Sequence, residues 1–174
     1  MPMKKNLFIT GNPGCGKTTL IKEVCLPFID KVGGFYTEEM IDNNSRLGFL
    51  LKTFDGREGI LAKKGMKSAH RFNKYGINIG VLEGIAADSL KKTINDKELI
   101  VIDEIGSMEI ISEKFRKALM EALNSEKRVL ATLRYNAQPF TDDIKKMKNS
   151  SIITLSRENY IDVKKEVKKW IGEL

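Results

Sequence analysis

Apolar residues recur along this chain with two different periods, one typical of buried strands and one typical of amphipathic helices. Short apolar runs at residues 7–10, 99–103, 128–133 and 151–155 predict strands, and residues 34–40 could form a further one. Apolar residues at helical spacing predict helices over residues 18–30, 82–95, 112–123, 140–147 and 158–170. Apolar strands separated by helices predict a mostly parallel sheet with helices on both faces, which is a three-layer α/β fold.

Two of the predicted helices carry more detailed signals. Ser112 precedes a helix whose apolar residues share one face, so we expect its side chain to cap the first turn. In the last helix, four apolar residues are expected to contact the core: Ile161, Val163, Val167 and Trp170.

One segment interrupts the alternation of strands and helices. Residues 46–54 and 58–62 flank the strong turn dipeptide Asp55-Gly56, so we expect a β-hairpin inserted at about 46–62. The 174 residues contain no internal repeat, low-complexity stretch or linker. We therefore expect a single P-loop domain over residues 1–174, a size that one hydrophobic core can fill.

The composition, 41% hydrophobic and 30% charged residues, is that of a soluble globular protein. We expect no membrane span, because no apolar run approaches the roughly 18 residues that one needs. We expect no signal peptide, because only Leu7-Phe8-Ile9 separates the first lysines from a glycine-rich loop. A disulfide between Cys15 and Cys25 is not expected either. These features favour a cytoplasmic location, and we expect a monomer.

The net charge of +7 raises the question of a nucleic-acid partner. The lysine pairs are dispersed over separate segments, such as Lys63-Lys64 and Lys145-Lys146. Lysines near the end of a helix also complement its dipole. A nucleic-acid partner is therefore permitted by the charge but not favoured, and a positive field suits a polyphosphate substrate equally well.

Residues 11–18 match the phosphate-binding motif G-x-x-x-x-G-K-[ST], between a predicted strand and a predicted helix. The expected nucleotide contacts here are Gly11, Asn12, Pro13, Gly14, Cys15, Gly16, Lys17, Thr18 and Thr19. The glycines let phosphate approach the main chain, and N–H groups at a helix N-terminus favour anions. Lys17 is expected to reach the β- and γ-phosphates, and the Thr18 hydroxyl to bind Mg²⁺.

The apolar strand over residues 99–103 ends in two adjacent carboxylates, Asp103 and Glu104. Ligands of open α/β sheets bind beyond the carboxyl ends of the strands, so both acids should face the phosphates. Asp103 is expected to hold Mg²⁺, directly or through water. Glu104 should point towards the γ-phosphate, where a carboxylate can orient and deprotonate the attacking water. Glu104 therefore favours hydrolysis over simple binding.

Residues 103–106 also match D-x-x-G, the pattern with which GTP-binding switch proteins sense the terminal phosphate. Ile105 and Gly106 are therefore expected among the nucleotide contacts. The N-K-x-D and T-K-x-D motifs that read guanine do not occur in the chain. The sequence thus favours a nucleoside triphosphate such as ATP or GTP, without strict selectivity for guanine.

Together these residues resemble the THEP class of small P-loop nucleoside-triphosphatases, which includes the cancer-related nucleoside-triphosphatase. Besides the phosphate loop, the resemblance rests on residues 34–39 (G-F-Y-T-E-E), 75–78 (Y-G-I-N) and 101–109 (V-I-D-E-I-G-S-M-E), and it covers nearly the whole chain. It implies a RecA/AAA-like core and Mg²⁺-dependent hydrolysis of ATP, GTP, CTP and UTP to the diphosphate. It also places Thr37, Glu38 and Glu39 near the site.

The chain departs from the usual pattern of this family in two places. Ser107 follows D-E-I-G where lysine is usual, and Leu133-Arg134 stand where relatives carry a proline-containing turn. A sensor role for Thr132 is therefore left open. So is the arginine that would neutralise charge in the transition state, for which the sequence offers Arg116, Arg134 and Arg157.

Two other functions use the same phosphate machinery. A small-molecule or nucleoside kinase could use the inserted hairpin as a lid or acceptor site, although an acid directly after Asp103 is less expected there because the acceptor needs room. A nucleic-acid-dependent ATPase or a nucleotide-controlled switch is permitted by the net charge, but no aromatic and basic recognition motif supports it. The triphosphatase is the leading hypothesis.

Overall fold

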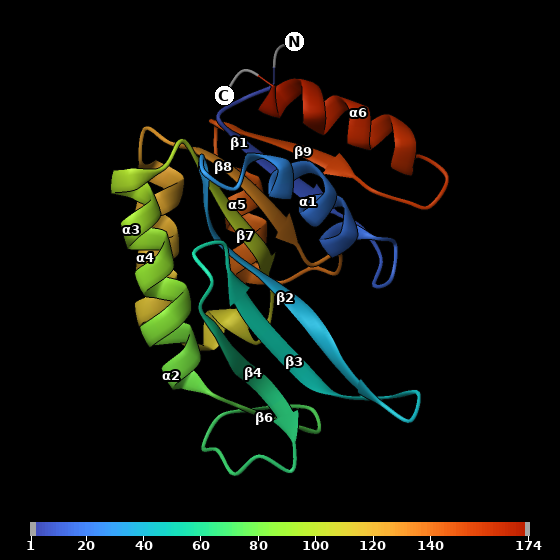
Figure 1. Cartoon of the computed structure of the whole chain (residues 1–174), viewed down its shortest axis with the longest axis vertical. Helices are drawn as coiled ribbons and strands as arrows, with labels where there is room; N and C mark the ends of the chain where they lie inside the picture. Colours follow the sequence, from blue (N-terminus) through green and yellow to red (C-terminus); the bar gives the residue numbers. More distant parts are fainter. Residues whose placement is uncertain (1–2, 173–174) are drawn as a thin grey trace.

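The structure, a computed structural model, describes residues 3–172. In this part of the chain nine strands form one continuous sheet, in the order β5-β6-β4-β3-β2-β7-β8-β1-β9. Helices pack on both faces of the sheet, as Figure 1 shows, and each face has its own cluster of buried apolar residues. The α/β fold with helices on both faces, predicted from the sequence, is confirmed.

Five neighbouring strands of this sheet are parallel. They are β2 (Val32–Asp42), β7 (Leu99–Ile105), β8 (Arg128–Leu133), β1 (Asn6–Thr10) and β9 (Ser150–Thr154). The strands that the apolar runs predicted in this half are all present. β1, β7 and β8 are almost entirely buried, as expected for parallel strands covered on both faces.

Two groups of helices cover the parallel half. On one face, α1 (Lys17–Cys25) packs beside α6 (Tyr160–Ile171). On the other, α3 (Ala87–Asp96) lies along α4 (Glu113–Asn124), with the short α5 (Pro139–Lys145) nearby (Figure 1). Within residues 3–172, no helix has both the length and the apolar character to cross a membrane.

The ends of the helices follow local chemistry. The Ser112 hydroxyl accepts a hydrogen bond from the Phe115 N–H at 3.0 Å, so the predicted cap of α4 is confirmed. α1 ends at Cys25, earlier than predicted, because Pro27 lacks an N–H and the chain turns into a 3₁₀ helix over Leu26–Phe28. The expected contact of Ile161 with the core is wrong.

The reason for that error is the position of Ile161 at the start of α6. Its side chain is 67% exposed, whereas Val163, Val167 and Trp170 are buried against the sheet. The four residues cannot all share one face of a helix, and the packing of the other three turns Ile161 towards solvent.

The other half of the sheet is antiparallel and continues from β2. The expected hairpin is formed by β3 (Ser45–Thr53) and β4 (Glu58–Lys64), which join through the Asp55-Gly56 turn. β2 runs well beyond β7 and pairs with β3 as far as Asp42. Two short strands, β6 (Tyr75–Ile77) and β5 (Arg71–Phe72), complete this edge and were not predicted, because two or three residues carry no readable period.

β2 joins the two halves, and its contact with β7 in the parallel half depends on Gly34. Gly34 has φ +95°, and a Cβ on it would lie 2.0 Å from the carbonyl oxygen of Val101. Its own carbonyl accepts hydrogen bonds from the Ser89 hydroxyl and the Phe54 N–H, both at 3.1 Å. The backbone here is held from three sides, so it cannot move to admit a side chain.

Gly34→Ala is expected to destabilise the fold by about 3 kcal/mol or more, because the substitution adds a backbone clash to an unfavourable φ. Gly56→Ala is the matched control, since Gly56 also has a positive φ (+89°) but open space where the Cβ would be. We expect it to cost only about 1 kcal/mol. Urea unfolding of the three proteins measures the difference, and equal costs for the two variants would contradict the packing argument.

Candidate functional site

The candidate site lies at the carboxyl ends of β1, β8 and β7, which are neighbours in the sheet. The phosphate loop connects β1 to α1, and Gly16 is the residue directly before the helix. A Cβ on Gly11 would lie 2.3 Å from the Leu155 carbonyl oxygen, so only glycine fits between the loop and the segment after β9. Cys15 is a buried free thiol within the loop, and Cys25 is also free.

Lys17 and Thr18 open α1 and have different partners. The Lys17 ammonium donates to the carbonyl oxygens of Gly11 (2.8 Å) and Asn12 (3.2 Å), so it lies back across the loop. The Thr18 hydroxyl donates to Asp103 Oδ2 at 2.7 Å. The structure thus brings the phosphate motif and the acidic strand end together, 85 residues apart in the chain.

Asp103 is buried and held from several sides. Its Oδ1 accepts a hydrogen bond from the Thr132 hydroxyl at 2.6 Å, in addition to the bond from Thr18. Burial raises the pKa of Asp103, and the bonds from Thr132, Thr18 and the Thr37 backbone partly offset that effect. Thr132, whose role the sequence left open, therefore contacts the acid at the centre of the site.

The pair formed by Thr18 and Asp103 suits a magnesium ion. Mg²⁺ prefers oxygen ligands and usually binds through one or two carboxylates, water and substrate phosphates. A hydroxyl oxygen and a carboxylate oxygen lie 2.7 Å apart here, beside the phosphate loop. Residues 3–172 contain no group of three or more His, Cys, Asp or Glu residues that could hold a metal ion. The remaining ligands would therefore be phosphate oxygens and water.

Glu104 lies next to Asp103 and is half-buried. Burial raises the pKa of Glu104, and so does the charge of Asp103, while Lys17 and Arg134 act in the opposite direction. The carboxylate reaches Gly106, where a Cβ would lie 2.9 Å from Glu104 Oε1. The side chain of Ile105 is fully buried in the hydrophobic core on one face of the sheet.

Glu109 is a further acid of this site, and no role was predicted for it from the sequence. It is 1% exposed, and its Oε2 accepts a hydrogen bond from the Gly106 N–H at 3.1 Å. Burial raises the pKa of Glu109 to about 8, and the charge of Glu104 adds to the effect. In the sequence, Glu109 is the last residue of the distinctive 101–109 segment, but nothing in that segment assigns it a role.

Arg134 is the arginine that the structure brings to the acids. Its guanidinium donates to the Ser107 hydroxyl, and its charge lowers the pKa of Glu104. Arg116 instead donates to the Ile110 carbonyl oxygen at 2.6 Å, and Arg157 is exposed in the segment after β9. The sequence could not separate these three residues, because the pairing of Arg134 with Ser107 joins the ends of two strands.

The acids of β2 lie beside the site, but their charges are already compensated. Glu38 forms ion pairs with Lys22 (2.5 Å) and Lys52 (2.9 Å), and Glu39 pairs with Arg46. Thr37 reaches Asp103 through its backbone only. Of this segment, the main chain therefore takes part in the site, while its carboxylates tie β2 to α1 and β3.

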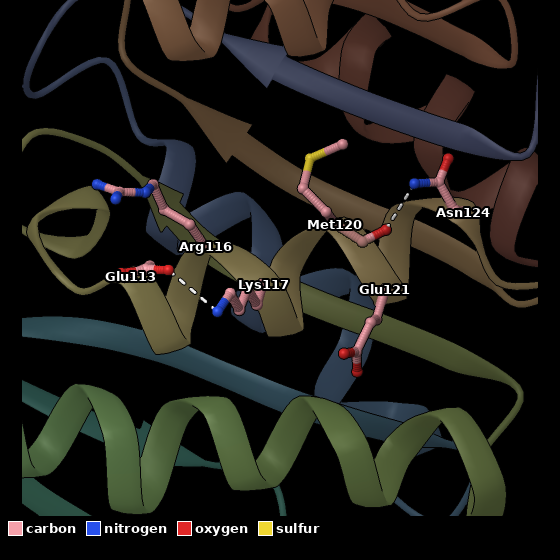
Figure 2. A pocket seen from close by; sticks show the side chains of 6 residues that line it. All are labelled: Glu113, Arg116, Lys117, Met120, Glu121 and Asn124. Carbon is pink, nitrogen blue, oxygen red and sulfur yellow. Dashed lines mark hydrogen bonds and ion pairs between the residues drawn. The ribbon is translucent and has the colours of Figure 1, made fainter.

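Two surface hollows differ in their position relative to this site. One of about 510 Å³ lies along the outer side of α4 (Figure 2), and its lining contains an exposed Glu113–Lys117 pair but no residue of the phosphate loop or of β7. The other, of about 470 Å³, begins at Thr19 and follows α1. Its lining residues are Thr19, Lys22, Glu23, Leu26 and Pro27. Of the two hollows, only the second is lined by a residue expected to contact nucleotide, which is Thr19.

Comparisons with known proteins agree with this geometry. Residues 6–168 match the family model described as "NTPase". The nucleoside-triphosphatase THEP1 of Thermotoga maritima is 44% identical over 153 residues, which cover 88% of this chain and 87% of the relative. THEP1 of Thermotoga petrophila is 42% identical over 162 residues, 92% of this chain and 89% of the relative.

Two solved structures are also similar. The crystal structure of THEP1 from Aquifex aeolicus has a TM-score of 0.85 and 30% sequence identity, and the match covers 93% of this chain and 96% of that chain. The solution structure of a human cancer-related nucleoside triphosphatase has a TM-score of 0.79 and 28% identity, with 97% of each chain covered. Both likenesses extend over the antiparallel half as well as the parallel half.

Glu109→Gln is expected to flatten the pH dependence of folding stability between about pH 5 and pH 8. The pKa of Glu109 is about 8 in the folded chain and 4.5 ordinarily, so between these values the folded chain keeps a proton that the unfolded chain has released. Rising pH then favours unfolding, by up to about 1.4 kcal/mol per pH unit. Glutamine can still accept the Gly106 N–H but has no proton to lose.

Urea unfolding of both proteins at several pH values within that window measures this difference. Contributions from distant titrating groups cancel when the variant is subtracted from the wild type, so the difference reports on Glu109 together with its interaction with Glu104. Parallel stability curves for the two proteins would show that Glu109 does not titrate in this way.

Proposed function

Because this chain belongs to the THEP1 family of P-loop nucleoside-triphosphatases, we propose that it hydrolyses the terminal phosphoanhydride bond of nucleoside 5'-triphosphates with the aid of Mg²⁺. One observation carries the proposal. The Thr18–Asp103 pair, which suits the metal, lies beside the phosphate loop, with Glu104 as a second carboxylate next to it. A protein that only bound nucleotide would not need that second acid.

The phosphate loop would bind the triphosphate. Main-chain N–H groups at the start of α1 face an anion favourably, and Gly16 has no side chain to compete for them. The Lys17 ammonium, now bonded to two loop carbonyls, can exchange these partners for β- and γ-phosphate oxygens. Thr18 and Asp103 would hold Mg²⁺, which when bound neutralises phosphate charge and fixes the orientation of the phosphates.

Glu104 would orient the attacking water and accept its proton. As the water oxygen bonds to the γ-phosphorus, the bond from that phosphorus to the bridging oxygen breaks, and its electron pair stays on the diphosphate. The residues on either side of Glu104 in the chain, Asp103 and Ile105, are buried, so bulk water would have limited access to the carboxylate. Gly106 leaves the carboxylate the room it occupies, since any Cβ would press on it.

The site would discriminate only weakly between the four nucleobases. The hollow that begins at Thr19 is the space next to the phosphate loop into which a nucleoside could extend. Its lining has no amide side chain, and its two charged groups, Lys22 and Glu23, already form ion pairs with Glu38 and Lys164, so no side chain there is reserved for one particular base edge. This lining supports hydrolysis of ATP, GTP, CTP and UTP alike.

Glu104→Gln is expected to lower kcat by about 100-fold to 10,000-fold, because the amide cannot accept the proton of the attacking water. Nucleotide affinity should change by no more than about twofold, since the phosphate contacts remain. Phosphate release and equilibrium binding of a nonhydrolysable ATP analogue measure the two effects separately.

Glu113→Gln makes the same chemical change on the exposed side of α4 and serves as the matched control. Unchanged turnover in Glu104→Gln would remove Glu104 from the mechanism. If the wild type bound nucleotide tightly but released no phosphate, the proposed hydrolysis would be wrong. A kinase or a nucleotide-controlled switch would then be the better explanation.

Phosphate release from ATP, GTP, CTP and UTP is expected to require Mg²⁺ and to stop when EDTA is added. Thr18→Val should raise the Mg²⁺ concentration needed for half-maximal rate by about tenfold or more, because it removes one oxygen ligand while keeping the shape of the side chain. A Mg²⁺ titration with each nucleotide measures both effects. If GTP alone were hydrolysed, the predicted weak discrimination between nucleobases would be wrong.

A further inference from the structure

We propose that Arg134 contacts the terminal phosphate during hydrolysis and neutralises the charge that develops there, and that Ser107 is the positioning residue that holds the Arg134 guanidinium in place. The inference rests on the proposed function, because it assigns a further residue to the same reaction. Three features of the structure carry it: the anchoring of the Arg134 backbone, the partner of its side chain and the lack of an ion-pair partner for its half-buried charge.

The backbone of Arg134 is fixed between the two halves of the site. Arg134 directly follows β8, which lies between β1 and β7 in the sheet (Figure 1). Its carbonyl oxygen accepts a hydrogen bond from the Thr10 hydroxyl at 3.4 Å, and Thr10 is the residue before the phosphate loop. The side chain therefore starts from a point flanked by the phosphate loop on one side and the acids of β7 on the other.

The side chain of Arg134 turns towards the acids. Its Nη1 donates to the Ser107 hydroxyl, three residues beyond Glu104, and its charge acts on the Glu104 carboxyl. A guanidinium has five N–H donors in a planar fork, so the single bond to Ser107 leaves donors for phosphate oxygens. The anchor is a neutral hydroxyl, which fixes the position of the positive charge without cancelling it.

The charge of Arg134 is also uncompensated by any ion pair. None of the ion pairs formed within residues 3–172 includes Arg134, whereas Glu38 and Asp55, for example, each pair with two cations. Arg134 is half-buried, so its field is less screened than that of a surface arginine. A site that is to bind a highly charged anion beside buried and half-buried acids needs such a cation, one whose charge is not already taken up by an ion pair.

The chemistry gives this cation a specific task. In the transition state, charge spreads over the three equatorial oxygens of the γ-phosphoryl group while the bond to the diphosphate breaks. Lys17 and Mg²⁺ would neutralise charge on the β- and γ-phosphate oxygens nearest the bond that breaks, and Glu104 would receive the proton of the attacking water. Arg134, reaching in from the end of β8, would pair with γ-phosphate oxygens and act as an arginine supplied by the same chain.

Arg134→Ala is expected to lower kcat by about 100-fold while changing the affinity for ADP by no more than about twofold. The decisive readout is binding of ADP with aluminium fluoride, which imitates the transferring phosphoryl group and whose affinity should fall roughly in step with kcat. Arg134→Lys keeps the charge but not the fork, so its loss should be intermediate. Arg71→Ala, on exposed β5 at the far edge of the sheet, is the matched control.

Ser107→Ala tests the positioning role through a double-mutant cycle. Alone, it should lower kcat by about fivefold and weaken binding of the fluoroaluminate complex, with ADP affinity unchanged. In the Arg134→Ala background it should have no further effect, because the hydroxyl acts only through the guanidinium. Additive losses in the double variant would overturn the positioning role.

The outcomes separate this inference from the function on which it rests. A wild type that releases no phosphate contradicts the proposed function first. Wild-type turnover in Arg134→Ala, with Glu104→Gln inactive, leaves the hydrolase intact and overturns the role of Arg134. Equal losses of ADP and fluoroaluminate affinity would also overturn it, because Arg134 would then support the folded site in general. Thermal unfolding of each variant, together with Arg134→Lys, distinguishes a misfolded protein from an impaired one.

Discussion

The structure depends above all on satisfying one buried carboxylate. Asp103 lies out of contact with solvent, where an unpaired charge would be costly, and its two oxygens are occupied by hydroxyls from different elements. Thr18 brings α1 to it and Thr132 brings β8, while the backbone of Thr37 adds β2. These contacts fix the position of α1 relative to the sheet. Because the phosphate loop leads directly into α1, the hydrogen bonds of Asp103 also determine where the loop lies.

A second constraint is charge balance. Asp103, Glu104 and Glu109 lie within seven residues of the chain, and burial raises the pKa of each. Repulsion by neighbouring acids adds to the effect at Glu104 and Glu109. A nucleoside triphosphate would bring further negative charge into the same space. Two cations lie close to these acids. They are Lys17, which lies across the phosphate loop, and Arg134, whose guanidinium donates a hydrogen bond to Ser107. The site therefore pairs crowded acids with cations whose partners are neutral oxygens.

The sequence predicted those features that depend on neighbours along the chain. The phosphate loop is one uninterrupted motif, and the apolar strands are readable because burial on both faces leaves a continuous run. What it missed depends on packing between distant segments. Ile161 faces solvent because the other apolar residues of α6 decide the orientation of the helix, and β5 and β6 exist only through pairing with β4. Arg134 and Ser107 are 27 residues apart, and no local pattern links them.

The pairing of β1 has a consequence for how the protein is made. β1 precedes both of its neighbours in the chain, because Leu7 pairs with Leu130 on one side and with Ser151 on the other. Gly11 likewise fits against the Leu155 carbonyl. A nascent chain ending before β8 would contain the complete phosphate motif but neither neighbour of the strand that presents it. The phosphate motif therefore acquires its geometry only when β8 and β9 have paired with β1, and a bound nucleotide would stabilise that paired state.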